Sequence, residues 1–112
     1  MKINIEVDTY DKQLSSDILG KKSINSGDKR DIFRNTTLEY QLTIKKFLME
    51  APDTIYFTLE ISGNVATNSS IFATWLHDNL KTRALKLRIN RNEVEIDESE
   101  IKKTIKEIIK WG

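Results

Sequence analysis

His77 is the single histidine of the chain and the side chain best suited to acid–base chemistry near neutral pH. A catalytic histidine needs a nucleophile and a third group that orients it, and the sequence contains no Gly-x-Ser-x-Gly elbow. His77 instead follows Trp75 and Leu76 in a segment with helical spacing, which is typical of a partly exposed helix residue. We therefore predict that the chain is not an enzyme.

Carboxylates are the other candidates for chemistry, as ligands of Mg²⁺ or Ca²⁺. Asp8, Asp11 and Asp17 lie near one another but lack the spacing and the central glycine of a calcium loop. A denser acidic group fits a strand face and the first turn of a helix, where negative charge favours the helix dipole; it comprises Glu93, Glu95, Asp97, Glu98 and Glu100. The segment 20–23 also lacks the spacing of a phosphate loop. We expect no metal site and no cofactor.

A basic stretch, residues 81–91, contains five cations and no acid. Such a cluster could contact nucleic-acid phosphates. In a hairpin, however, Lys86 and Arg88 would face Glu93 or Glu95 across the strands, and such pairs stabilise a sheet. Exposed aromatic residues do not interleave with these cations, as they do in single-strand binders. The pattern favours a structural role, and weak nucleic-acid binding stays open as an alternative.

Composition limits the class of protein. The sequence has 112 residues, which fits one domain, with 38% hydrophobic and 31% charged residues. A formal net charge of +1 gives no overall field toward nucleic acid or an anionic membrane. Cysteine is absent, which excludes disulfides, zinc–thiolate sites and cysteine nucleophiles. Because no apolar run resembles a signal peptide or a membrane span, we expect a cytoplasmic protein without a membrane partner.

The first third of the chain predicts a strand, a short helix and a loop. Apolar and polar residues alternate over 3–7, which is typical of a strand with one buried face. Apolar residues four apart then favour a short helix; they are Tyr10, Leu14 and Ile18. Residues 20–35 show no periodicity, and we expect a polar loop or insert there, mobile in the free protein.

Residues 38–50 fit two different elements. A strand would alternate apolar and polar positions, as at Leu38, Tyr40, Leu42 and Ile44. A helix would place Tyr40, Ile44, Phe47, Leu48 and Ala51 on one stripe. Thr36 and Glu39 have the spacing of a capping box, and Pro52 would end a helix. We predict a helix, and the strand stays open as the alternative.

The second half has clearer patterns. They predict a strand over 55–61, a helix over 71–80 with its N-cap among 67–70, a hairpin over 85–96 that turns at 90–92, and a last helix capped by Asp97. The predicted fold class is α+β, in the order β-loop-α-β-α-β-β-α, within one domain over residues 1–112. We expect a mixed four-stranded sheet with helices packed on it, in which the strand–helix–strand unit 54–90 is parallel.

Several short segments of the second half carry a family resemblance. They are Ile61-Ser-Gly-Asn-Val-Ala, Trp75-Leu76, Leu85-Lys-Leu-Arg-Ile-Asn, Glu93-Val-Glu-Ile-Asp and the final helix. Residues 61–110 thereby resemble the effector-associated constant component proteins of prokaryotic conflict systems. The resemblance implies a cytoplasmic bacterial adaptor or partner of a defence effector. It carries no catalytic motif, so it assigns no site residues.

These patterns favour a protein that acts by binding. The first hypothesis is a protein–protein interaction module of a bacterial conflict system. The alternatives are a phage-encoded inhibitor of a host defence complex, of the anti-CRISPR type, a weak nucleic-acid binder, and, last, a carboxylate-dependent enzyme.

The candidate contacts are basic, because positive charge is concentrated in the 20–35 loop, with a net charge of +3, and on the outer face of the hairpin. Basic surfaces predict a partner with an acidic surface, and arginine pairs with carboxylates bidentately. Trp111 is an additional candidate anchor. The predicted contact residues are Arg30, Arg34, Arg83, Arg88, Arg91 and Trp111.

Overall fold

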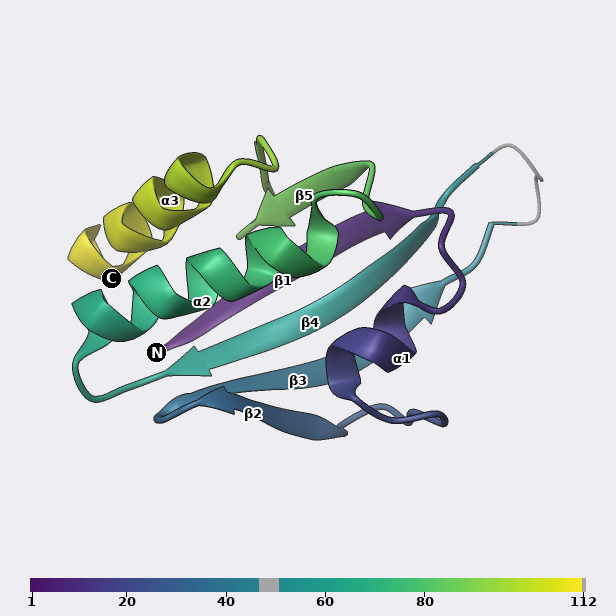
Figure 1. The fold of residues 1–112 in the computed structure, drawn as a ribbon, viewed down its shortest axis with the longest axis horizontal. Helices are drawn as coiled ribbons and strands as arrows, with labels where there is room; N and C mark the ends of the chain where they lie inside the picture. The colour runs from purple at the N-terminus through teal and green to yellow at the C-terminus, as the bar shows by residue number, and fades with distance from the viewer. Residues whose placement is uncertain (47–50, 112) are drawn as a thin grey trace.

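A computed structural model describes residues 1–46 and 51–111. Within these residues the chain forms six strands and three helices (Figure 1). In chain order they are β1 (Lys2–Thr9), α1 (Leu14–Leu19), β2 (Lys29–Phe33), β3 (Thr36–Ile44), β4 (Asp53–Ile61), α2 (Val65–Leu80), β5 (Lys86–Ile89), β6 (Asn92–Val94) and α3 (Glu98–Trp111).

The six strands form one antiparallel sheet in the order β2-β3-β4-β1-β5-β6. β1 lies between β4 and β5, so α2 connects two strands that run in the same direction without touching each other. The set β1-α1-β3-β4-α2-β5 has the split β-α-β arrangement of ferredoxin-like domains. β2 extends this core at one edge, and β6 with α3 extends it at the other.

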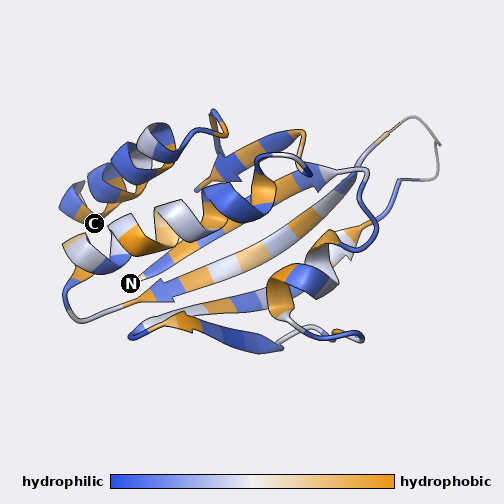
Figure 2. Cartoon of the chain, viewed as in Figure 1, coloured by the Kyte–Doolittle hydropathy of each residue, from blue (hydrophilic) through white to orange (hydrophobic). Residues whose placement is uncertain are grey.

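The hydrophobic core lies between the sheet and the helices. α1 and α2 lie against one face of the sheet, and α3 packs beside α2 (Figure 1). Strand residues alternate between hydrophobic and hydrophilic along the sheet (Figure 2), so one face meets the helices and the other meets water. The largest buried side chains come from both layers; among them are Ile3, Ile5, Leu38, Leu59, Phe72, Leu76 and Leu87.

The prediction of a helix over 38–50 is wrong, because residues 36–44 form β3. β3 is paired on both sides, with β2 and with β4, so its amides have partners that the sequence does not reveal. Thr36 is buried in the strand instead of capping a helix, and Leu38 and Tyr40 enter the core. The alternating pattern therefore prevails over the capping box. Residues 47–50 lie outside the described part of the chain.

The prediction of a structureless loop over 20–35 is wrong in its second half, because 29–33 form the edge strand β2. β2 buries little of its surface, and its sequence Lys-Arg-Asp-Ile-Phe has no regular apolar alternation. Its pairing with β3 supplies the stabilisation that its side chains do not. The short helix before it is confirmed as α1, in which Leu14 and Ile18 are buried and which Gly20 caps in the left-handed conformation. Tyr10, expected on the same stripe, lies before the helix and is 52% exposed.

The expected sheet is corrected from four mixed strands to six antiparallel ones. The two strands of the strand–helix–strand unit, β4 and β5, were expected to pair in parallel, but β1 lies between them. A sequence cannot show that the first strand of a chain inserts between two later strands, because that pairing is entirely non-local.

The remaining elements of the second half are confirmed, with local corrections. The hairpin turns at Asn90 and Arg91, both at positive φ, and Leu87, Ile89 and Val94 are buried. The alternation over 85–96 also predicts Leu85 and Ile96 on the core face. Leu85 is instead 52% exposed, because it precedes β5, and Ile96 follows β6 and is partly buried. Helix α2 starts at Val65 and not after 67–70; Asn64 caps it by accepting a hydrogen bond from the N–H of Thr67.

Amide hydrogen exchange tests the corrected strands β2 and β3. The N–H of Gly27 donates to the carbonyl of Tyr40 at 2.8 Å, and the N–H of Tyr40 donates to the carbonyl of Asp28 at 2.8 Å. We expect slow exchange at Gly27 and Tyr40 and fast exchange at Arg34, which lies in the exposed turn. A mobile loop would let Gly27 exchange at the unprotected rate, which would contradict this pairing.

Candidate functional site

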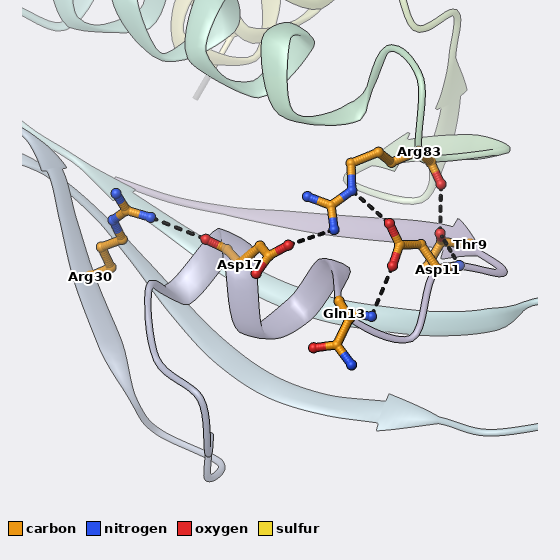
Figure 3. A network of polar contacts seen from close by, with 6 residues as sticks. All are labelled: Thr9, Asp11, Gln13, Asp17, Arg30 and Arg83. Atoms are coloured by element: carbon orange, nitrogen blue, oxygen red, sulfur yellow. Dashed lines mark hydrogen bonds and ion pairs between the residues drawn. The ribbon is translucent and has the colours of Figure 1, made fainter.

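Arg83 holds helix α1 to the connection between α2 and β5. Its Nε donates to Oδ2 of Asp11 at 2.6 Å, and its Nη2 donates to Oδ2 of Asp17 at 2.7 Å (Figure 3). Its carbonyl accepts a hydrogen bond from Oγ1 of Thr9 at 2.6 Å (Figure 3). The guanidinium of Arg83 is therefore engaged by carboxylates of its own chain.

Arg88 is engaged in the same way on the open face of the sheet. Its Nε donates to Oε2 of Glu6 at 2.8 Å, and its two terminal nitrogens donate to both oxygens of Asp8 at 2.7 and 3.0 Å. Asp8 also accepts a hydrogen bond from Oγ1 of Thr54 at 2.8 Å. This network lies across β4, β1 and β5 and stabilises the centre of the sheet.

Arg30 faces the helices. Its Nη1 donates to the carbonyl of Asp17 at 3.3 Å (Figure 3) and to that of Ile18 at 2.8 Å, both at the C-terminal end of α1. Its guanidinium carbon lies 5.8 Å from the centre of the Trp75 ring. Arg30 therefore binds α1 to α2 and the sheet.

The predicted basic stretch is thus largely neutralised within the chain. Besides Arg83 and Arg88, Lys86 pairs with Glu93 at 3.8 Å and Lys81 pairs with Asp78 at 4.0 Å. Arg91, and also Arg34 in the β2–β3 turn, are exposed and form no ion pair among the described residues. Of the predicted contact residues, the structure leaves Arg34, Arg91 and Trp111 available to a partner.

Helix α3 presents a basic surface, which we call the α3 lysine face; its members are Lys102, Lys103, Lys106 and Lys110. Spacings of three and four residues place these lysines on one side of the helix. They form no ion pair among the described residues. The lysines, with Ser99 and Glu107, line a shallow groove of about 360 Å³. The sequence pattern places these lysines on the solvent side of the last helix, but they were not among the predicted contact residues.

The position of α3 is determined by its opposite side. Ile101 and Ile105 are fully buried, and Oγ1 of Thr74 on α2 donates to Glu98 at 2.5 Å. Asp97 caps the helix by accepting a hydrogen bond from the N–H of Glu100 at 3.1 Å, as predicted. At the other end Trp111 is 81% exposed, and Nζ of Lys110 lies 5.4 Å from the centre of its ring. The lysine face therefore ends in an exposed aromatic ring on a fixed helix.

Of the residues considered for chemistry, the structure places His77 on α2 and pairs the aspartates of the first third with arginines. His77 lies on α2, and no hydroxyl of the described chain hydrogen-bonds to its ring; its Nδ1 lies 3.7 Å from the carboxylate of Asp78. Asp8 is held by Arg88, and Asp11 and Asp17 are held by Arg83. Residues 1–46 and 51–111 contain no cluster of acidic or histidine side chains arranged to hold a metal ion. The same residues contain no helix long and apolar enough to cross a membrane.

Three of the internal contacts lower the pKa of carboxyl groups. The hydrogen bond from Arg88 lowers the pKa of Asp8, that from Arg83 lowers the pKa of Asp11, and that from Lys12 lowers the pKa of Asp53. A lowered pKa in the folded state stabilises the fold above the unfolded-state pKa of about 3.9. That stabilisation is lost as the pH falls through the folded-state pKa.

Denaturation at low pH tests these contacts. We expect the urea midpoint to fall between pH 6 and pH 3, because these carboxylates lose their charge and their cationic partners. Asp8→Asn removes one of the titrating groups and should reduce the fall. An unchanged pH dependence in Asp8→Asn would show that Asp8 is not coupled to folding.

Comparisons with known proteins identify no relative of this chain. No family model matches the sequence, and no curated protein or solved structure is significantly similar to it. The function is therefore argued from the surface of the fold.

Proposed function

We propose that this chain is a non-enzymatic protein-binding module that docks an acidic surface of its partner on the α3 lysine face. One observation carries the proposal. The lysines of this face have no carboxylate partner among the described residues, whereas Arg83, Arg88 and Lys86 are paired within the chain.

Charge and anchoring have separate roles on this surface. Exposed lysines attract an acidic partner over a distance and chiefly raise the association rate. Trp111 adds an apolar ring that a partner can cover, and tryptophan is enriched among the residues that dominate binding energy. The buried contacts of Ile101 and Ile105 fix the position of α3, so the lysines and Trp111 are preorganised for binding.

The biological setting of the proposal comes from the sequence resemblance. Residues 61–110, which resemble components of prokaryotic conflict systems, correspond to the segment from the end of β4 to α3. We propose the role of an adaptor of a defence effector. A phage-encoded inhibitor would use the same surface on a host complex, and the neighbouring genes distinguish the two: an effector gene or phage structural genes.

Binding to defined probes tests the proposal. Lys103→Glu/Lys106→Glu reverses two exposed charges on the lysine face. We expect it to weaken binding of a poly-glutamate peptide about tenfold or more, since each exposed contact is worth about 0.2–1 kcal/mol and is turned into repulsion. Fluorescence anisotropy of the labelled peptide at low salt measures the affinity, and circular dichroism verifies that the helix remains.

The matched control is Lys21→Glu/Lys22→Glu, which makes the same change in net charge at exposed positions after α1. We expect it to bind almost as the parent does. An equal loss of affinity in both variants would mean that binding depends on net charge alone, which would contradict the proposal. Single-stranded DNA and anionic vesicles are the alternative ligands. If either binds more tightly than poly-glutamate, and Lys103→Glu/Lys106→Glu abolishes that binding, the partner of this face is a nucleic acid or a membrane and not a protein.

A further inference from the structure

The open face of the sheet is hollowed at two adjoining places. One cavity of about 240 Å³ lies over β1, β3 and β4, and Arg91 reaches it from the hairpin turn. A neighbouring cavity of about 200 Å³ lies over β1 to β4 toward β2. Both are lined by Asn4, Gln41 and Thr58, so the two cavities form a continuous trough across the middle of the sheet.

A bulge in β3 gives this trough its apolar end. Tyr40 pairs with Phe57, and the register then shifts so that Leu42 pairs with Tyr56. Gln41 is the extra residue of the bulge. In a strand without a bulge Leu42 would face the helices as Tyr40 does, because side chains alternate along a strand. The bulge turns Leu42 and Ile44 to the open face, where they are 47% and 41% exposed. Leu42 and Tyr56 then form the apolar wall of the larger cavity.

The free charge of the larger cavity is positive. Its one carboxylate, Glu6, is held by Arg88 at 2.8 Å. Arg91 forms no ion pair among the described residues and sits at a φ of 72° in the tight turn between β5 and β6. The floor adds unused polar groups, because no described residue hydrogen-bonds to the side chain of Asn4. An apolar wall beside an unpaired cation fits an apolar side chain with a carboxylate close to it.

We infer that this cavity is a second docking site, which takes a peptide segment with one large apolar residue and a carboxylate within one or two residues of it. The apolar side chain lies against Leu42 and Tyr56, and the carboxylate pairs with Arg91. The site lies on the open side of the sheet, away from the α3 lysine face, so the chain can hold two segments at once and act as a bridge.

Other occupants fit this face less well. Acids outnumber cations along this face by six to five, so it attracts phosphate backbones weakly. The charged residues are Lys2, Glu6, Asp8, Lys29, Asp31, Glu39, Glu60, Lys86, Arg88, Arg91 and Glu93. Tyr56 is the one aromatic side chain of the described strands that faces this side, whereas single-strand binders stack successive bases on several rings. A second copy of the chain would find few apolar groups beyond Leu42, Ile44 and Tyr56.

Selection from a displayed library of random peptides tests the inference. We expect the peptides enriched on the parent protein to share a large apolar residue with Asp or Glu within two positions. Binding of a synthetic peptide of that pattern should fall about tenfold or more in Leu42→Ser and in Arg91→Glu. Both positions are exposed, so we expect both variants to keep the fold, which circular dichroism verifies. The same peptide with Asn or Gln in place of the acid should also bind more weakly.

Two controls separate this site from the lysine face. Lys103→Glu/Lys106→Glu should bind the selected peptides as the parent does. This expectation does not depend on whether the same variant loses binding to poly-glutamate, so the two sites are tested separately. Enrichment without the shared pattern, or full binding in Arg91→Glu, would overturn the inference. A dimer in sedimentation that Leu42→Ser dissociates would also overturn it, because a second copy would then occupy the face.

Discussion

Leu87→Ala should lower the free energy of unfolding by about 2–5 kcal/mol. Leu87 is fully buried in β5, where it lies opposite Val7 of β1 and Val94 of β6. Truncation removes apolar contacts and leaves a cavity that the sheet, paired on both sides at this point, cannot close. Urea denaturation followed by circular dichroism measures the change in midpoint at constant slope.

Leu85→Ala is the matched control for this prediction. Leu85 is two residues away, is 52% exposed, and has the same side chain to lose. We expect its unfolding free energy to stay within about 0.5 kcal/mol of the parent value. Equal effects at the two leucines would mean that the register of β5 against β1 is wrong.

Arg88→Met should lower the free energy of unfolding by about 2–3 kcal/mol. The substitution keeps much of the apolar stem but leaves Glu6 and Asp8 adjacent on β1 without their cation. All three side chains are largely buried, at 24%, 17% and 14% exposure, so water compensates poorly for the lost hydrogen bonds.

Lys86→Met provides the comparison within the same strand. Lys86 reaches Glu93 at 3.8 Å with both side chains exposed, and such pairs contribute about 0–1 kcal/mol. Urea midpoints of the two variants at neutral pH should therefore differ clearly. Arg88→Met with the stability of Lys86→Met would show that the network on the open face does not stabilise the sheet.

Local patterns predicted the second half of the fold. The hairpin was predictable because apolar alternation on both strands agrees with a turn whose Asn tolerates positive φ, as Asn90 does at 48°. Helices α2 and α3 were predictable because their apolar stripes repeat every three or four residues over 16 and 14 residues. In these segments propensity, spacing and turn chemistry lead to the same structure.

Non-local pairing explains the errors in the first half. Strand β2 has weak patterning and exists because β3 is beside it, and β3 in turn is stabilised by β4. The capping-box spacing of Thr36 and Glu39 was a valid local signal, but a helix there would forgo pairing with both neighbours. The bulge that turns Leu42 outward has no sequence signal that we can identify.

For the same reason the sequence does not reveal how Arg83 and Arg88 are engaged, because their partners are non-local. The sequence marks Arg83 and Arg88 as members of a basic cluster, but their carboxylate partners lie 66 to 82 positions away in the chain. Such partners are brought together by the sheet and by α1, and a linear pattern does not contain them. The lysines of α3 have no such partner among the described residues, so for them the sequence pattern and the surface agree.

A map of the residues that an acidic chain contacts tests docking on the α3 lysine face. Nitrogen-15 NMR spectra of the protein, titrated with poly-glutamate at low salt, report every amide and the indole N–H of Trp111. We expect chemical-shift changes at Trp111 and along the α3 lysine face, and much smaller changes at the turn of Asn90 and Arg91 and on the open face of the sheet. Shifts centred on the hairpin, with α3 unaffected, would contradict docking on the α3 lysine face.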